Sequence, residues 1–267
     1  MLDTLERTLS EQGGLVLLSG EPGVGKSAVL EALSRRWGAV LTLRGREDGE
    51  HTPFLPLFVA LRERLSVLRS LEGVWRREVA RLIPELEPEL HPNLQAGPTA
   101  PEGRAHFLEA LSHALERVLS GALLVLEDLH LFDPSSLEVL SLWSHGAGTG
   151  VGRAIASVRP EEGRANTALE RWTRALERRG RLTSLVLPAL SETETLRLVR
   201  ALSPSGRGGT LFSRHLFETT EGNPLFMLET LKGLLESGEL REEEGEWHTP
   251  FDSATHDYHE LPLPHSV

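Results

Sequence analysis

The residues most suited to chemistry form a short glycine-rich segment, GEPGVGKS, at residues 20–27. Its spacing matches G-x-x-x-x-G-K-[ST], and it stands between an apolar run, LVLL, and a stretch with helical spacing. Glycines let successive backbone N–H groups point at one anion, and the N-terminal end of the next helix adds positive charge. We therefore predict that this segment binds phosphate, and the alternative is a tight turn without a ligand. The predicted binding residues are Gly20, Glu21, Pro22, Gly23, Val24, Gly25, Lys26, Ser27 and Ala28.

Two side chains of this segment have specific tasks. Lys26 is one of only two lysines among 28 basic residues, so the chain uses arginine almost wherever a positive charge suffices. A lysine ammonium is compact and enters a phosphate cradle in which a planar guanidinium would not fit, and it contacts the β- and γ-phosphates. The hydroxyl of Ser27 is a ligand for Mg²⁺ in this motif. Together the two residues predict a site for a nucleotide with Mg²⁺.

A second acidic element follows an apolar run in the segment LLVLEDLHLFD. The run ends in Glu127 and Asp128. One carboxylate can hold Mg²⁺ through its water shell while the other orients an attacking water. The spacing alone does not assign the two roles, and the pair could instead cap the loop that follows.

The segments around these motifs alternate between apolar, strand-like runs and amphipathic, helical stretches. This alternation predicts an α/β fold with a parallel sheet flanked by helices, the arrangement of a P-loop NTPase. Because residues 122–126, ALLVL, are apolar without alternation, we expect a central strand covered on both faces. The predicted strands are Leu15–Ser19, Val40–Arg44, Ala122–Glu127, Ala154–Val158 and Leu182–Leu187, and the helices between them begin near Ser27, Pro56, Glu102, Ser135 and Asn166.

The pattern changes to helices only after Pro188. Ser191 precedes Glu194 by three residues, which is the spacing of a capping box at a helix start. Further helices are predicted near Thr210–Thr219 and Pro224–Ser237. We expect a nucleotide-binding α/β domain over residues 1–187, a small helical lid over 188–240, and an extended or poorly ordered segment over 241–267. The proline-rich insertion at residues 81–103 is predicted to be an irregular surface segment that could form a flap.

Composition limits the function classes. The chain has 267 residues, a formal net charge of −11 and no cysteine, and the charge argues against broad contact with a nucleic-acid backbone. No apolar run approaches the ~20 residues of a membrane span, and the N-terminus lacks a signal pattern. We expect a cytoplasmic protein without direct nucleic-acid or membrane binding. The arginines of residues 171–181 fit a solvated helix face. The C-terminal histidines, which are not expected to form a metal site, are His248, His256, His259 and His265.

Five segments in this order resemble the STAND class of P-loop ATPases, the signal-transduction ATPases with numerous domains. The segments are GEPGVGKS, LLVLEDLHLFDPSSLEVL, SVRPEE, GRLTSLVLPALSETET and EGNPLF. The chain is most similar to the AAA-like ATPase modules of large bacterial transcriptional activators that carry LuxR-type or related DNA-binding domains. The resemblance spans roughly residues 14–267 and implies a nucleotide-dependent regulatory switch.

The resemblance also implies roles for single residues. Glu127 stands where the family usually has the aspartate associated with Mg²⁺, and Asp128 stands at the position of the carboxylate that orients water. Arg159, in SVRP, matches an arginine that probes the γ-phosphate, and a lone loop arginine is the alternative. The GNP turn, residues 222–224, belongs to the lid that closes over the nucleotide in the family, so Pro224 joins the predicted binding residues. His130 matches a family position but fits a packing role equally well.

The chain departs from the family pattern near both ends. The Gly-Arg-Glu segment that contributes to the adenine pocket in the family is missing from MLDTLERTLS. The ending LPLPHSV resembles the lead into the family's winged-helix domain, so the resemblance implies regulatory or output domains, or protein partners, that this chain does not include. Self-association that depends on the nucleotide is a further expectation.

Three functions are compatible with these features. The first is an ATP-binding, slowly hydrolysing ATPase module that uses ATP or ADP with Mg²⁺ and acts as a regulatory switch. The second is a non-hydrolysing domain that binds nucleotide or protein, because Glu127 replaces the usual aspartate. A small-molecule kinase, the third, is disfavoured because no phosphoacceptor pocket is evident.

Overall fold

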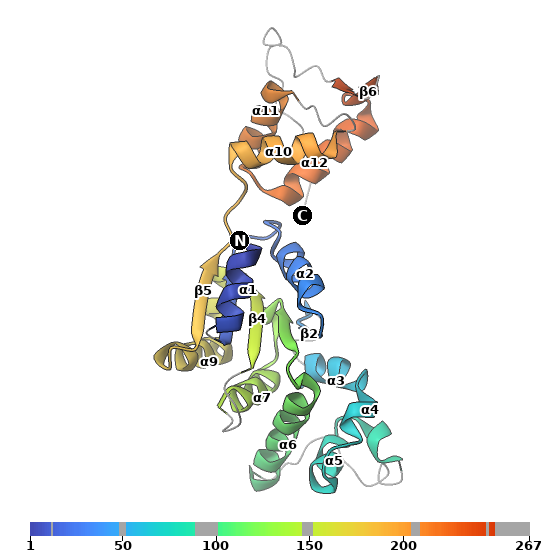
Figure 1. Ribbon diagram of the computed structural model, residues 1–267, viewed down its shortest axis with the longest axis vertical. Coiled ribbons are helices and arrows are strands. Elements are labelled where there is room, and N and C mark those ends of the chain that lie inside the picture. Colours follow the sequence, from blue (N-terminus) through green and yellow to red (C-terminus); the bar gives the residue numbers. More distant parts are fainter. Residues whose placement is uncertain are drawn as a thin grey trace. The chain divides into compact units, whose positions relative to one another are not determined.

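A computed structural model gives the fold (Figure 1). The structure describes residues 1–11, 13–47, 52–88, 101–145, 152–203, 209–243 and 246–248. The chain forms two compact units. The first contains residues 1–19 and 26–186, and the second contains residues 20–25 and 187–267.

A five-stranded, all-parallel sheet forms the centre of the first unit (Figure 1). In the sheet the strand order is β2-β3-β4-β1-β5, so β4 lies between β1 and β3. All five residues of β3 are buried, as expected for a central strand. The predicted α/β fold with a parallel sheet flanked by helices is confirmed. The strands are β1 (Gly14–Ser19), β2 (Val40–Arg44), β3 (Leu123–Glu127), β4 (Arg153–Val158) and β5 (Leu182–Val186).

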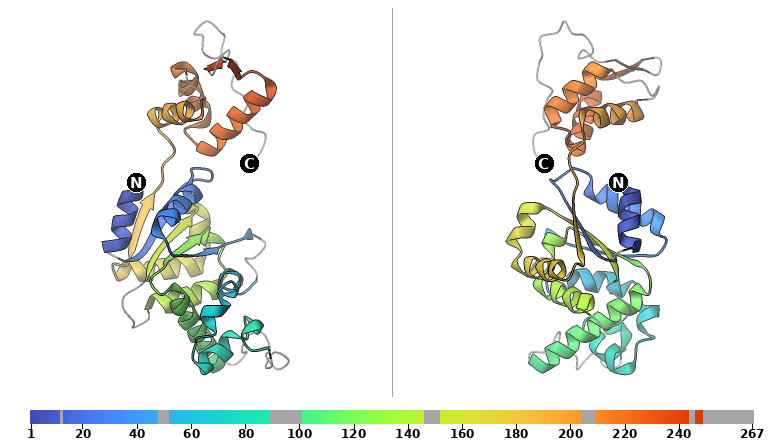
Figure 2. Two further views of the ribbon diagram at one scale, coloured as in Figure 1. Left: turned by 45° about the vertical axis from the view of Figure 1, so that its right-hand side comes forward. Right: turned by 60° about the vertical axis from the view of Figure 1, so that its left-hand side comes forward.

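Side chains of alternate strand residues enter two separate cores. Val16, Leu123 and Val125 pack with residues of α1 and α2, whereas Leu124 and Leu126 pack with residues of α3, α6, α7 and α9. The two helix layers therefore lie on opposite faces of the sheet (Figure 2). The larger helices of this unit are α1 (Leu2–Glu11), α2 (Lys26–Trp37), α3 (Leu55–Arg62), α6 (Pro101–Leu119), α7 (Pro134–His145) and α9 (Thr167–Arg178).

Sequence reasoning placed one helix near Pro56, but the chain there forms several short helices. The backbone of Glu72, with ψ 144°, is not helical and separates α4 (Leu65–Leu68) from α5 (Gly73–Val79). Trp75 lies against His106 and His113 of α6, with ring centroids 5.1 and 4.6 Å apart. Of the predicted irregular insertion, residues 89–100 lie outside the described residues. The remaining short elements of this unit are α4 (Leu65–Leu68), α5 (Gly73–Val79), η2 (Pro84–Leu86), η4 (Leu129–Leu131) and α8 (Pro160–Ala165).

The second unit is built on three helices, α10 (Glu192–Leu202), α11 (Thr210–Thr220) and α12 (Pro224–Ser237). The predicted capping box is present, because Ser191 and Glu194 bond reciprocally at the start of α10. Phe212, Leu216, Met227 and Leu234 belong to a small apolar core.

The segment over residues 241–267, which the sequence predicts to be extended or poorly ordered, begins with two short strands. β6 (Arg241–Glu243) pairs antiparallel with β7 (Glu246–His248). The hairpin is short, so its sequence offers too few residues for a period-two pattern to be recognised. Residues 249–267, including His256, His259 and His265, lie outside the described residues.

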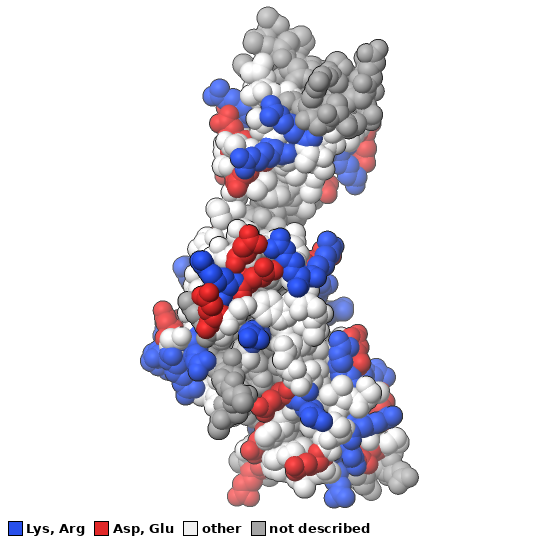
Figure 3. Space-filling view, in the orientation of Figure 1, with Lys and Arg blue, Asp and Glu red and all other residues white. Residues whose placement is uncertain are grey.

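Charged side chains of both signs are mixed over the face drawn in Figure 3. Surface ion pairs include Arg174 with Glu170 on α9 and Arg214 with Glu218 on α11. Among the described helices, none combines the length and the apolar character needed to cross a membrane.

Candidate functional site

The glycine-rich segment connects β1 to α2, as the sequence predicts. Gly23 and Gly25 adopt the left-handed backbone conformation, with φ of 80° and 97°, which few other residues tolerate. A side chain at Gly25 would meet no atom within 4 Å, so its backbone conformation alone requires glycine there. Lys26 begins α2 and is buried, with 8% of its surface exposed. The local geometry therefore suits a phosphate loop followed by a helix N-terminus.

Glu127 is the last residue of β3 and is largely buried. Its carboxylate oxygen Oε2 accepts a hydrogen bond from Nε of Arg44 at 2.6 Å, and Nη2 of the same guanidinium also pairs with it. Arg44 ends β2 directly opposite Glu127 in the register of the two strands. One oxygen of the predicted magnesium partner is therefore occupied by an arginine from the neighbouring strand.

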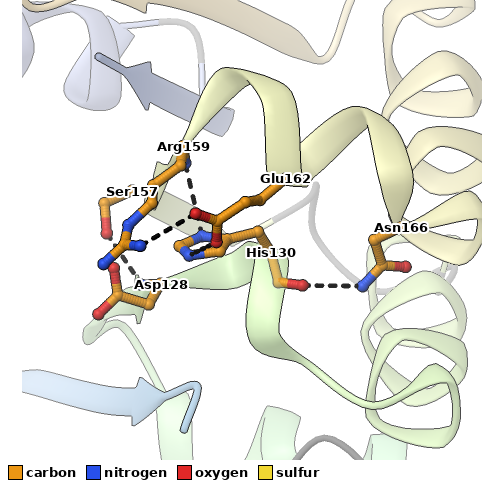
Figure 4. Close-up of polar contacts among 6 residues, drawn as sticks. All are labelled: Asp128, His130, Ser157, Arg159, Glu162 and Asn166. Carbon is orange, nitrogen blue, oxygen red and sulfur yellow. Dashed lines mark hydrogen bonds and ion pairs between the residues drawn. The ribbon is translucent and has the colours of Figure 1, made fainter. Parts of the chain in front are cut away.

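Asp128 leaves the strand with a left-handed backbone, at φ 51° and ψ 51°. Its N–H donates to the hydroxyl of Ser157 on β4 at 2.9 Å, which ties the ends of two neighbouring strands together (Figure 4). Its carboxylate forms no hydrogen bond or ion pair with the parts of the chain that the structure describes. Of the two acidic residues, Asp128 is thus the one whose carboxylate is available to a substrate or a water.

Arg159 directly follows β4, as predicted, and is the N-cap residue of α8. Its Nη1 lies 2.9 Å from Oε1 of Glu162, one helical turn further along (Figure 4). Both side chains are partly exposed, at 36% and 45%, so water competes for this pair and its net strength is small. A phosphate in reach could therefore replace the glutamate as the partner of Arg159.

His130 is buried and contacts Arg159 and Glu162. Its Nδ1 accepts from the backbone N–H of Arg159 at 3.4 Å, so the ring proton resides on Nε2. Nε2 lies 3.0 Å from Oε2 of Glu162, but its N–H is not directed at that oxygen, so no hydrogen bond forms. The amide of Asn166 donates to the backbone oxygens of His130 and Phe132, both at 3.1 Å. The packing role that the sequence left open for His130 is thus present.

The pKa of His130 is lowered from its ordinary value of 6.5, mainly because burial disfavours the charged ring. The charges of Glu162 and Asp128 raise this pKa, and those of Arg159 and Lys26 lower it further. These four charged groups therefore lie within electrostatic reach of one imidazole. The structure places Asp128 and Arg159, two of the predicted site residues, beside His130 (Figure 4).

Sequence reasoning missed three residues that shape the site. Arg44 ends a predicted strand, but its pairing with Glu127 depends on β2 lying beside β3, which the sequence does not specify. Ser157 accepts a hydrogen bond from the N–H of Asp128, and this contact likewise depends on which strand lies beside β3. Glu162 had a local signal, because it follows Arg159 by three residues at a proline-initiated helix start.

Pro224, the predicted binding residue of the second unit, is the first residue of α12. Asn223 caps this helix, since its Oδ1 accepts from the N–H of Leu225 at 3.0 Å. The helix-start reading of the GNP turn is therefore correct, and a contact between Pro224 and a nucleotide stays a prediction.

The donors that the sequence assigns to magnesium, the hydroxyl of Ser27 and the carboxylate of Glu127, are of the kind that fits magnesium bound through a nucleotide. No group of three or more His, Cys, Asp or Glu side chains that could hold a metal occurs in the described ranges. Magnesium commonly keeps waters and takes one or two carboxylates together with substrate phosphates, so a single carboxylate and the hydroxyl of Ser27 suit it. Arg44 pairs with Oε2 of Glu127, so Oε1 is the oxygen that Glu127 could offer to the metal.

Comparisons with known proteins identify a family for the segment that contains these residues. A family model described as "AAA ATPase domain" matches residues 1–149, which include the glycine-rich segment and the acidic pair. No curated protein matches the sequence significantly. Among solved structures, the chain is similar to the ORC2 protein of Aeropyrum pernix, described as ADPNP-ADP complexes. The identity is 17% and the TM-score 0.48, over 89% of this chain and 62% of that protein, so the chain spans less than two thirds of it.

Proposed function

The chain belongs to the AAA ATPase domain family, and from this premise we propose that it binds ATP or ADP with Mg²⁺ and hydrolyses ATP slowly. The carboxylate of Asp128 carries the proposal, because it forms no hydrogen bond or ion pair within the described part of the chain and lies near Arg159 (Figure 4). Hydrolysis needs such a group beside the γ-phosphate.

The residues divide the binding task. Backbone N–H groups of the glycine-rich loop, to which Pro22 contributes none, and the N-terminus of α2 would hold the phosphates, and Lys26 would contact the β- and γ-phosphates. The hydroxyl of Ser27 would ligate Mg²⁺. The carboxylate of Glu127 would be a second partner while it also pairs with Arg44. When bound, the metal neutralises charge that develops on the phosphate oxygens. Glu21, Pro22, Val24, Ala28 and Pro224 complete the proposed binding set.

In the proposed reaction, Asp128 accepts a hydrogen bond from a water and orients it toward the γ-phosphorus. The oxygen of this water bonds to phosphorus while the bond from phosphorus to the β–γ bridging oxygen breaks, so ADP leaves with the bridging oxygen. Both protons of the water stay with the released phosphate, which then loses one to solvent. Arg159 leaves Glu162 and pairs with the γ-phosphate, where its guanidinium stabilises the negative charge.

A second candidate is a domain that binds nucleotide without hydrolysing it. The pairing of Glu127 with Arg44 favours this candidate, since an arginine occupies the carboxylate that the family uses for the metal. The two candidates share nucleotide binding and differ only in turnover.

We further propose that the module is a regulatory switch of the STAND type, derived from a transcriptional regulator. The five ordered motifs of the sequence support this context. Output domains or protein partners would then read the bound nucleotide, with nucleotide-dependent self-association as one route. A cytoplasmic location, without direct contacts to nucleic acid, belongs to the same proposal.

Thermal unfolding with and without magnesium and nucleotide tests the binding step. Ligand at about 100 times its dissociation constant should stabilise the fold by about 2.7 kcal/mol. We expect this gain with ATP and with ADP, and we expect its loss in Lys26→Ala. Lys232→Ala replaces the other lysine of the chain, which is exposed on α12, and should retain the gain. Absence of a gain in the parent protein would overturn the proposal.

A further inference from the structure

The start of helix α12 contacts the backbone of the phosphate loop. Nδ2 of Asn223 donates to the backbone oxygen of Pro22 at 2.8 Å. The N–H of Leu225, which already bonds to Oδ1 of Asn223, also lies 3.3 Å from the backbone oxygen of Gly23. Loop residues 20–25 and α12 belong to the same compact unit. Two successive loop carbonyls are therefore held by the first turn of one helix.

The turn that carries Asn223 is itself firmly placed. Gly222 has φ 79°, and a side chain there would come within 2.0 Å of the backbone oxygen of Leu190. The N–H of Leu190 in turn donates to the oxygen of Gly222 at 2.8 Å. Pro224 fixes the first backbone angle of the helix. The turn that positions the side-chain amide of Asn223 against the loop therefore has little conformational freedom.

The loop is shaped to receive this helix. A Cβ atom on Gly23 would lie 2.6 Å from Oδ1 of Asn223 and 2.8 Å from Cβ of Leu225. Both distances are far below a van der Waals contact, so any side chain at this position would force the loop and the helix apart. Gly23 is therefore needed for its missing side chain as well as for its backbone conformation.

The contact determines which way a loop N–H points. In a planar trans peptide the C=O and the following N–H point in opposite directions. Because Asn223 holds the oxygen of Pro22, the N–H of Gly23 points away from α12, and it forms no hydrogen bond with the described residues. A free N–H in this loop is what an anion requires.

We propose that Asn223 is a positioning residue for phosphate, which holds the Pro22–Gly23 peptide so that the N–H of Gly23 is ready for the anion. The inference rests on the proposed function and adds to it a residue that need not touch the nucleotide. Loss of the clamp leaves the loop free to rotate this peptide, and binding must then order it again.

Two substitutions separate the clamp from the helix cap. Asn223→Ser keeps an oxygen that can cap α12, but its side chain is too short to reach Pro22. Asn223→Asp keeps the shape of the side chain and the cap of α12. It replaces the donor Nδ2 by an oxygen, which cannot donate to the backbone oxygen of Pro22. Ser191→Ala is the matched control, because it removes the cap of the neighbouring helix α10. The hydroxyl of Ser191 bonds only to Glu194 within the described residues.

The experiment combines calorimetric titration of ADP in the presence of Mg²⁺ with amide hydrogen exchange of residues 20–25 in the absence of nucleotide. We expect Asn223→Ser to weaken ADP binding about 3- to 10-fold, as for one neutral hydrogen bond, and Asn223→Asp to weaken it at least as much. Loop amides should exchange faster in both variants, and Ser191→Ala should change neither readout.

Parent-like affinity and exchange in Asn223→Ser would overturn the inference. A parent protein that binds no ADP would overturn the proposed function instead. The exchange comparison would then still decide whether Asn223 orders the loop.

Discussion

Arg44 and Glu127 stand opposite each other at the carboxyl ends of β2 and β3, and the guanidinium donates to one carboxylate oxygen. The glutamate side chain is 12% exposed and the arginine side chain 65% exposed. A mostly buried carboxylate is thus neutralised from the solvent side by a residue of the edge strand. A metal that uses Oε2 of Glu127 must compete with this arginine.

Replacement of Arg44 should therefore strengthen the Mg²⁺ dependence of nucleotide binding and lower the free energy of unfolding. In Arg44→Met the carboxylate of Glu127 loses its counter-charge, so the nucleotide-free protein should lose about 1 kcal/mol of unfolding free energy. The same change should strengthen the dependence of nucleotide binding on Mg²⁺, because the oxygen becomes available. Denaturant unfolding and calorimetric titrations of ADP at several Mg²⁺ concentrations measure the two effects.

Arg62→Met is the matched control for this prediction, since Arg62 pairs with Glu85 on the surface at 2.6 Å and has a similar exposure of 56%. Its Mg²⁺ dependence should equal that of the parent. An unchanged Mg²⁺ dependence in Arg44→Met would show that Glu127 does not serve the metal.

The pair formed by Arg159 and Glu162 predicts how the site distinguishes ATP from ADP. Only ATP offers a γ-phosphate to the guanidinium, and Glu162 competes with it. We expect a weak preference for ATP in the parent, a stronger one in Glu162→Gln, and a smaller one than the parent's in Arg159→Ala, where only Lys26 still contacts the γ-phosphate. One charge-assisted contact corresponds to about 1.5–3 kcal/mol before this competition is subtracted. Paired titrations with ADP and a non-hydrolysable ATP analogue give the preference.

Glu161→Gln, an exposed neighbour on α8, is the control and should behave as the parent. A parent-like preference in Arg159→Ala would remove Arg159 from the site.

The lowered pKa of His130 predicts a pH dependence of stability. The unfolded chain binds a proton near pH 6.5, whereas the folded protein binds it only at lower pH. Stability from the neutral ring is therefore fully present above pH 6.5 and is lost as the pH falls toward the folded pKa. The slope is at most about 1.4 kcal/mol per pH unit for one proton.

Chemical denaturation of the parent and of His130→Asn between pH 5 and 8 measures this slope. The variant, which has no titrating ring, should lose less stability below pH 6.5. His145→Asn changes an exposed histidine at the end of α7 and should follow the parent. Equal slopes in all three proteins would exclude His130 as the cause.

The sequence predicts features that depend on local patterns. The strand at 40–44 and the helix at 224–237 lie where the apolar run and the Asn-Pro start place them. Features that need distant segments were out of reach. The Arg44–Glu127 pair requires the strand order, and the clamp by Asn223 joins residues 201 positions apart. The short hairpin and the division of the helix after Pro56 lack a period long enough to be recognised.

The central claim, ATP hydrolysis directed by Asp128, is tested most directly by single-turnover hydrolysis of labelled ATP with protein in excess and Mg²⁺ present. We predict slow, complete conversion of bound ATP to ADP in the parent. Asp128→Asn should bind ATP with parent affinity and form no ADP, because its amide orients water poorly, while Glu127→Gln should mainly weaken the Mg²⁺ dependence. Equal turnover in Asp128→Asn and the parent would contradict the account, as would a parent that binds ATP and leaves it intact.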